Sequence, residues 1–275
     1  MTASASWFLK IGGAITGVFL LLVVAGPALA PYDPQAVVGA SLVAPSGAHL
    51  LGTNDAGQDI LSQLLVGTRA SMLTGILAAT LAVAAGVLVG ATAGLLGGWA
   101  DLVAMRIVDV FLAIPALPLV ILIASLAGPS RATIVAVIAL AGWPPISRIV
   151  RSQTLVLASR GYVHAARGFD SGWPYVVRRH LVPGLAPLIV ATYVNWASAA
   201  IVLEAGLAFI GLGDPTAVSW GSVLQRALGH AGIYATAAWT WWVLPAGLAI
   251  AGAAIGLAFL GVAIEPRSNP RWARS

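Results

Sequence analysis

The stretch SRGYVHAARGFDSGWPYVVRRHLVPGLAP, Ser159–Pro187, lies between two long apolar segments and concentrates arginine, histidine, glycine and proline in a chain with few charges. Its first half has one apolar face, whose members recur at i, i+3, i+4 and i+7: Tyr162, Ala165, Ala166 and Phe169. Arg160, His164 and Arg167 fall on the other face. This spacing predicts a short amphipathic helix that ends near Gly168.

Such a helix can serve two purposes. It can lie at a membrane surface with its apolar face on anionic lipid. It can also insert that face into a groove of a soluble partner protein. The residues themselves leave both interpretations open.

The composition of the whole chain indicates an integral membrane protein. Of its 275 residues 59% are hydrophobic and 8% are charged, whereas soluble domains average about 25% charged residues. So few charges suit a surface that faces mostly lipid. There is no cysteine, which excludes disulfides and thiolate metal ligands. The net charge of +5 fits a positive-inside bias better than a nucleic-acid partner.

Segments long enough to cross a bilayer, which takes about 20 apolar residues, predict an all-α protein with six transmembrane helices. These segments are Ile11–Ala30, Ser71–Leu96, Val110–Gly128, Ala132–Ile149, Leu181–Ile210 and Trp239–Ile264. We expect the first to be a retained span and not a cleaved signal peptide, because so many spans follow it. The chain then divides into a first region with one span, an outer loop, a five-span core and a tail: 1–30, 31–70, 71–264 and 265–275.

Basic residues orient these spans. With both termini in the cytoplasm, the inner side holds eleven: Lys10, Arg106, Arg148, Arg151, Arg160, Arg167, Arg178, Arg179, Arg267, Arg271 and Arg274. The outer side holds Arg69, Arg131 and Arg226. This bias predicts cytoplasmic termini and outer loops at 31–70 and 211–238. We expect the tryptophans that begin the last span to anchor it at the outer headgroups: Trp239, Trp241 and Trp242.

Small residues and prolines predict how the spans pack. Gly86, Gly90 and Gly94 recur every four residues in the second span, a pattern that lets helix backbones approach closely. We expect this stripe to pack within the chain, with a subunit interface as the alternative. Pro115 and Pro118 each remove a helix donor and predict a kink in the third span.

Two parts of the opening stretch, HAARGFD and RRHLVPGLAP, resemble the cytoplasmic signature of ABC importer permeases. That signature reads Glu-Ala-Ala, three residues, Gly, nine residues, then His-x-Leu-Pro or a close variant. Four positions match: Ala165, Ala166, His180 and Pro183. Two depart, since His164 replaces the usual Glu and Asp170 the usual Gly, with Gly168 available for the bend.

Three further stretches resemble the same family in the same order. LGTNDAGQDILSQLLVGTRASMLTG, Leu51–Gly75, is similar to the outer-loop signature of peptide and nickel permeases. Asn54, Gln58 and Gln63 replace an Asp and two Arg there, so charge pairs made in relatives are not expected. GGWADLVAMRIVDVFLAIPALPL and LEAGLAFIGLGDPTAVSWG are similar to the third span and the fifth-span exit. The chain looks most like the second permease subunit of dipeptide and oligopeptide importers, the DppC/OppC type.

The resemblance implies a type I ABC importer permease fold, in which residues 159–173 form a coupling helix that docks into a cytoplasmic ATPase. It implies four kinds of partner in the cell membrane: a homologous second permease subunit, two ATPase subunits that use ATP and Mg, an extracytoplasmic substrate-binding protein, and lipid. The expected cargo is peptides, with nickel or another small solute as the alternative. The sequence has no Walker A loop, and we expect no catalytic role, cofactor or metal in this chain.

Charged residues inside the spans are candidates for the translocation path. Glu204 stands alone in the fifth span, where insertion of a carboxylate costs about 2.5–3.5 kcal/mol. We expect it to line the path or gate with Tyr193 and Asn195, or else to make a structural contact with the backbone or with one outer arginine: Arg69, Arg131 or Arg226. Arg106 and Asp109 are spaced to pair with each other at i,i+3.

Two other classes of membrane protein remain as rivals. A secondary carrier should show paired intramembrane acids in two similar halves, and Glu204 alone supports this weakly. An intramembrane hydrolase needs a nucleophile and base or a metal set within the bilayer. All four histidines fall outside the predicted spans: His49, His164, His180 and His230.

Overall fold

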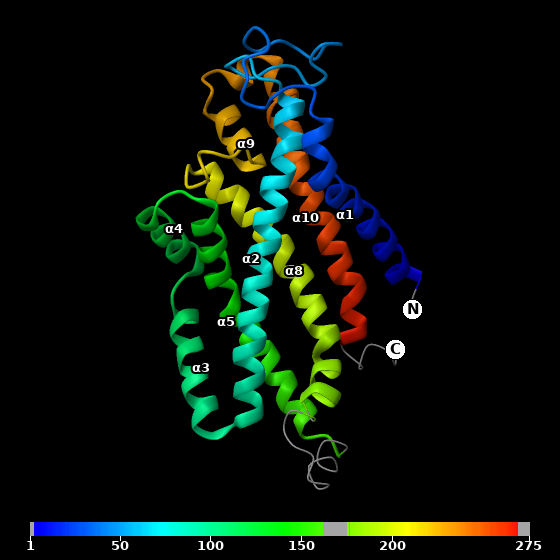
Figure 1. Cartoon of the computed structure of the whole chain (residues 1–275), viewed down its shortest axis with the longest axis vertical. Helices are drawn as coiled ribbons and strands as arrows, with labels where there is room; N and C mark the ends of the chain where they lie inside the picture. The colour runs from blue at the N-terminus through cyan, green and yellow to red at the C-terminus, as the bar shows by residue number, and fades with distance from the viewer. Residues whose placement is uncertain (1–2, 162–174, 176, 269–275) are drawn as a thin grey trace.

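The computed structural model describes residues 3–161, 175 and 177–268, and this part of the chain is built from helices and loops. The helices are α1 (Ala3–Leu29), α2 (Ile60–Leu96), α3 (Gly98–Ala113), α4 (Ala116–Ala127), α5 (Arg131–Ala158), α8 (Val182–Phe209), α9 (Trp220–Gly229) and α10 (Val243–Ser268). A π turn, η1 (Val177–Leu181), precedes α8, and two 3₁₀ turns, η2 (Ile233–Ala235) and η3 (Ala237–Thr240), precede α10. The long helices run side by side, with the loops after α1 and α8 gathered at one end (Figure 1).

Among the described residues, five helices are long and apolar enough to cross a membrane: α1, α2, α5, α8 and the segment that ends in α10. The bent pair α3 and α4 makes a sixth span if it is counted as one. The chain is therefore an integral membrane protein of the predicted helical class.

The third predicted span, Val110–Gly128, is wrong as a single helix. It begins inside α3, which ends at Ala113, and α4 leaves at an angle of 85°. Ile114 is extended, with φ −88° and ψ 129°, because the ring of Pro115 disfavours a helical residue before it. Pro115 then opens α4 without needing a backbone donor.

The helix that contains the second predicted span, Ser71–Leu96, begins before that span. Helix α2 begins at Ile60, so the irregular part of the outer loop is shorter than 31–70. Asp59 fixes this start, because its Oδ2 accepts the backbone N–H of Ser62 at 2.8 Å and the Ser62 hydroxyl at 2.7 Å. A side chain that caps the first turn in this way satisfies helix donors that would otherwise have no partner.

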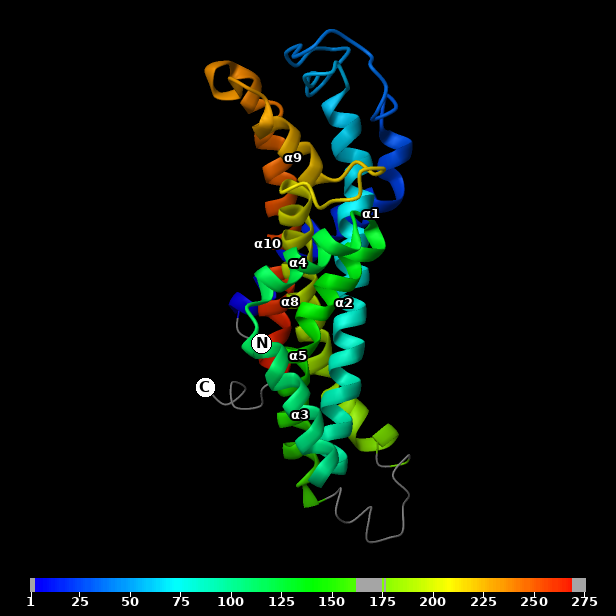
Figure 2. The same cartoon turned by 90° about the vertical axis from the view of Figure 1, so that its left-hand side faces the viewer.

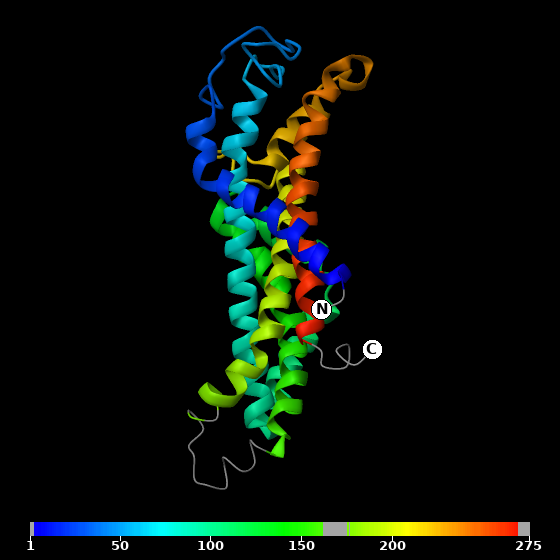
Figure 3. The ribbon, with the colours of Figure 1, turned by 90° about the vertical axis from the view of Figure 1, so that its right-hand side faces the viewer.

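Helices α2 and α5 pack through the glycine stripe, as predicted. A Cβ added at Gly86 would lie 2.5 Å from Ile146, one at Gly90 would lie 2.4 Å from the Ser147 carbonyl oxygen, and one at Gly94 would lie 2.9 Å from Thr154. The stripe therefore serves packing within the chain. Helix α1 slants across α2 and α10 (Figure 3), and Gly12 meets the backbone of Gly256 there.

At one end of the molecule, residues 31–59, α9 and the two 3₁₀ turns form what we call the outer cap (Figure 2). Its interior contains Ile60, Trp220 and Trp242, all fully buried. The prediction that Trp242 anchors the last span at the headgroups is therefore wrong, because this residue belongs to the protein core. Helix α10 begins at Val243, after the tryptophans, and continues to Ser268.

Candidate functional site

Most of the predicted coupling helix lies outside the described residues: Tyr162, His164, Ala165, Ala166, Arg167, Gly168, Phe169 and Asp170. Arg160 is exposed just after α5. The helix ends that flank this segment lie together, because a Cβ at Gly184 in α8 would be 2.9 Å from Leu157 in α5. Leu157 and Leu185 are buried in the same cluster. The two flanking ends meet at the end of the molecule opposite the outer cap (Figure 1).

Ion pairs near this end join α3 to α5. Arg151 of α5 donates two hydrogen bonds to the carboxylate of Asp101 in α3. Arg148 of α5 donates one hydrogen bond, through NH2, to Asp109 Oδ1 in α3. The predicted pair between Arg106 and Asp109 is present at 4.0 Å, with the arginine side chain 74% exposed. Because exposed pairs contribute little, the partly buried pair between Arg151 and Asp101 holds α3 to α5 more than the pairs of Asp109 do.

Glu204 of α8 is buried, with 3% of its surface exposed. It lines a cavity of about 10 Å³ together with Arg131, Asp214 and Ser219, and Ser71 and Ser219 lie within hydrogen-bonding reach of its carboxylate. Its Oε2 has no hydrogen-bond partner among the described residues. The cavity has room for one water molecule at most. Of the three arginines proposed as structural contacts, Arg131 lines this cavity.

The other two predicted path residues point in different directions from α8. The Tyr193 hydroxyl lies 3.4 Å from the Thr80 hydroxyl of α2, and Tyr193 is half-buried. Asn195 is exposed and lies against Gly261 of α10, where an added Cβ would be 2.1 Å from its Oδ1. The structure therefore places Glu204 and Tyr193 against α2 but separates Asn195 from them.

In the outer cap, the three amides that replace charged residues of the family bond one another. Asn54 Nδ2 and Gln63 Nε2 each donate to Gln58 Oε1 at 2.9 Å. Arg226 of α9 donates to the same oxygen at 2.9 Å through its NH1. Arg226 also donates through Nε to Asp55 at 2.7 Å. The amide cluster thus ties the loop before α2 to α9, and one ion pair remains at this surface.

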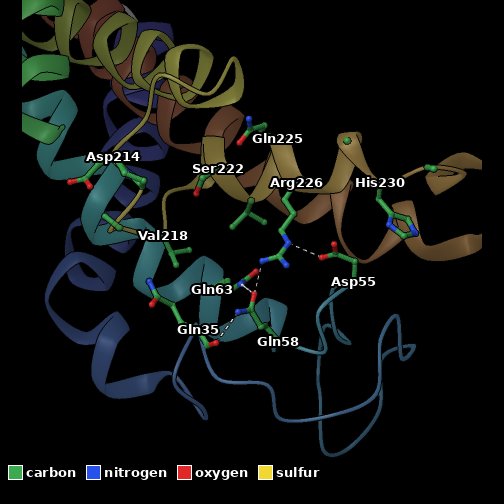
Figure 4. A pocket seen from close by; sticks show the side chains of 15 residues that line it. Gln35, Asp55, Gln58, Gln63, Asp214, Val218, Ser222, Gln225, Arg226 and His230 are labelled. Carbon is green, nitrogen blue, oxygen red and sulfur yellow. Dashed lines mark hydrogen bonds and ion pairs between the residues drawn. The ribbon is translucent and has the colours of Figure 1, made fainter. Parts of the chain in front are cut away.

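Between this loop and α9 lies a cleft of about 880 Å³, which we call the outer cleft (Figure 4). Its wall is polar and includes Gln35, Gln58, Gln63, Asp55, Asp214, Ser222, Gln225, Arg226 and His230. A volume of this size is within the range of ligand sites, about 300–1,000 Å³. Sequence reasoning missed this cleft because its two walls are more than 150 residues apart, as the bond between Asp55 and Arg226 shows. The stretch that resembles the family outer-loop signature supplied one wall, but no local signal joined it to α9.

Comparison with known proteins identifies the family. The sequence model described as "binding-protein-dependent transport system inner membrane component" matches residues 86–273. A Brucella suis biovar 1 protein assigned as a peptide permease is 36% identical over 98% of this chain and 91% of its own length. The glutathione transport system permease protein GsiD of Pectobacterium atrosepticum is 35% identical over 77% of this chain and 72% of its own length. The dipeptide transport system permease protein DppC of Bacillus subtilis is 35% identical over 78% of this chain and 69% of its own length. The membrane-spanning helices of this chain and these similarities together show that it belongs to the binding-protein-dependent inner membrane components, as an ABC importer permease subunit of the DppC/OppC type.

Proposed function

We propose that the chain imports peptides, as one half of the translocation pathway of an ATP-driven importer in the cell membrane. The observation that carries this proposal is the similarity along 98% of the chain to a protein assigned as a peptide permease. Relatives named for dipeptides and glutathione support the same cargo class over nickel. The pathway would be completed by a homologous second permease subunit, and an extracytoplasmic binding protein would deliver the peptide.

Energy would come from two cytoplasmic ATPase subunits that bind the segment between α5 and α8. The packed ends of these helices support this role, because a segment held at both ends can transmit a movement of its partner to both helices. Arg160 is exposed beside the segment and suits a charge-assisted contact at the rim of such an interface. Both termini would then be cytoplasmic.

The cargo proposal is tested by reconstituting the four-subunit importer with its binding protein in proteoliposomes. We expect external dipeptides and tripeptides to stimulate ATP hydrolysis and to accumulate inside when ATP is supplied. Nickel ions serve as the matched alternative substrate. Stimulation and uptake by nickel, without any by peptides, would contradict peptide import.

The coupling proposal is tested with Ala166→Asp. If Ala166 faces the ATPase, the new carboxylate must lose its water shell without a partner, which costs several kcal/mol, so we expect the ATPases to dissociate or their hydrolysis to be uncoupled from transport. Co-purification of the ATPases and peptide-stimulated hydrolysis are measured, with Ala158→Asp at the end of α5 as a control for membrane insertion. Normal association and stimulation in Ala166→Asp would exclude this docking face.

A further inference from the structure

The walls of the outer cleft keep polar groups that the fold does not use. Arg226 donates through Nε to Asp55 and through NH1 to Gln58. The NH2 group of its guanidinium donates to no acceptor in the described part of the chain. In the described part of the chain, no hydrogen bond engages the side-chain amides of Gln35 or Gln225, both of which line the cleft. Each amide can donate and accept. The cleft therefore offers hydrogen-bonding groups of both kinds to a ligand.

A carboxylate lies at one end of the cleft and an arginine, itself paired with a carboxylate, at the other. Asp214 is at the first end, and Arg226, whose Nε donates to Asp55, is at the second beside His230, with the glutamine side chains between them (Figure 4). Asp214 Oδ1 accepts the backbone N–H of Thr216 at 2.9 Å and its hydroxyl at 2.6 Å, and Arg131 also acts on this carboxylate through its backbone N–H and its charge. The Thr216 hydroxyl, helped by Arg131, holds the pKa of Asp214 below its usual range, so this carboxylate is ionised at neutral pH.

We propose that the outer cleft binds a short peptide directly, with the peptide ammonium at Asp214 and the peptide carboxylate at Arg226. Gln35 and Gln225 would bond the peptide links between them, since a side-chain amide can donate to a peptide carbonyl and accept from a peptide N–H. This inference rests on the proposed function in peptide import and adds a binding site on the permease itself. The peptide would occupy it between its release by the binding protein and its passage through the membrane.

A free peptide fits the cleft better than two other occupants. A loop of a docked protein lacks the free ammonium that Asp214 would bind and the free carboxylate that the NH2 group of Arg226 would bind. A nickel ion needs several ligands, and the described residues contain no group of three His, Asp or Glu side chains placed to hold a metal. The volume of about 880 Å³ also exceeds what a metal ion needs.

The experiment uses the complete importer in lipid nanodiscs, without binding protein and without ATP. Binding of three probes is measured by equilibrium dialysis: trialanine, N-acetyl-trialanine and trialanine amide. Because a hydrogen bond to a charged group contributes about 1.5–3 kcal/mol, blocking either peptide end should weaken binding about tenfold or more. Equal binding of all three probes, or no binding, would overturn the proposal.

The variant Asp214→Asn tests whether the peptide ammonium binds to this chain at Asp214. Asparagine keeps one oxygen that can accept from Thr216 and replaces the other by an uncharged amide nitrogen, so trialanine should bind about tenfold more weakly while N-acetyl-trialanine should bind as it does to the unchanged importer. The matched control is Asp33→Asn, an exposed outer carboxylate that accepts the backbone N–H of Gln35 and does not line the cleft. If Asp214→Asn weakened both probes equally, or neither, the assignment of the ammonium to Asp214 would be wrong.

Two further results separate this inference from the function on which it rests. ATP-driven trialanine uptake with binding protein, together with no binding in its absence, would overturn the cleft site and leave peptide import standing. Absence of peptide uptake under any condition would overturn the proposed function itself. Crosslinking of Gln225→Cys to the binding protein, equal with and without trialanine, would assign the cleft to protein docking and overturn the peptide site.

Discussion

Glu204 shows how one residue can combine a membrane location with a structural contact. It belongs to a spanning helix, yet it is buried beside Ser71, Ser219 and Arg131, away from lipid. Ser219 also caps α9, where its side chain accepts the backbone N–H of Ser222. A carboxylate in this position can hold the start of α9 against α2 and α8.

Glu204→Gln should therefore leave the fold intact, because glutamine has the same shape and keeps an oxygen within reach of Ser71 and Ser219. Glu204→Leu should lower the free energy of unfolding by about 1–3 kcal/mol, since it removes the buried acceptor within reach of these two hydroxyl groups. Thermal unfolding in detergent, followed by tryptophan fluorescence, measures both. If the Glu204→Leu protein were as stable as the Glu204→Gln protein, the structural role of Glu204 would be excluded and the path or gate hypothesis favoured. Changed transport by a stable Glu204→Gln protein would support that hypothesis directly.

The capping of α2 by Asp59 can be tested in the same way with a single substitution. It is 1% exposed, caps α2 through Ser62, and its other oxygen lies 3.1 Å from His49 Nδ1. Asp59→Ala should cost about 1–2 kcal/mol, the usual loss for a helix cap, and Asp59→Asn should cost less because one acceptor remains. The same unfolding assay measures this, with the exposed Asp33→Ala as control. Equal melting temperatures for Asp59→Ala and Asp33→Ala would show that the cap is not important for stability.

The site could be predicted from the sequence only in part. A lone carboxylate in an apolar segment indicates burial with a partner, and Arg131 was among the three arginines expected near Glu204. The helical repeat of 3.6 residues places positions nine apart on opposite faces, so the sequence alone already sets Asn195 and Glu204 on different sides of one helix. The outer cleft was not predictable, because nothing local links Gln35 to Arg226.

At the scale of helices, the pattern of small residues was the most informative signal. It identified the close packing of α2 on α5, where the carbonyl of Ser147 would lie 2.4 Å from a Cβ at Gly90. The ends of helices were harder to predict. Residues 60–70 fall within the predicted outer loop because they precede the long apolar run, whereas the helix already begins at Ile60. The proline at 115 predicted a kink without its angle of 85°.

Gly90→Ala tests the packing of α2 on α5. The added methyl group has no room beside a backbone oxygen, so the helices must separate, at a cost of about 1–3 kcal/mol. Gly17→Ala in α1 is the matched control, because nothing lies within 4 Å of its Cβ position, and alanine favours helix over glycine. A melting temperature for Gly90→Ala equal to that of Gly17→Ala would show that α2 and α5 are less tightly packed than described.

The orientation of the whole molecule is testable because the chain has no cysteine. Val37→Cys lies in the outer cap, where Val37 is 71% exposed, and it should react with an impermeant thiol reagent in intact cells. Ser171→Cys, in the segment between α5 and α8, should react only after the cells are permeabilised. Mass-tagging of the purified protein measures both. Reaction of Ser171→Cys in intact cells would invert the proposed topology.

Helix α2 has a consequence that follows from its length alone. Its 37 residues form one unbroken helix, about 55 Å long, in a bilayer whose hydrocarbon core is about 30 Å thick. Its first turn lies in the outer cap and its last turns pack on α5 near the opposite end. Such a rod acts as a lever arm: a tilt of about 5° around its middle moves each end by roughly 2.5 Å in opposite directions. A small rocking movement at the end of α2 opposite the outer cap would therefore change the width of the outer cleft without any bond in α2 being broken.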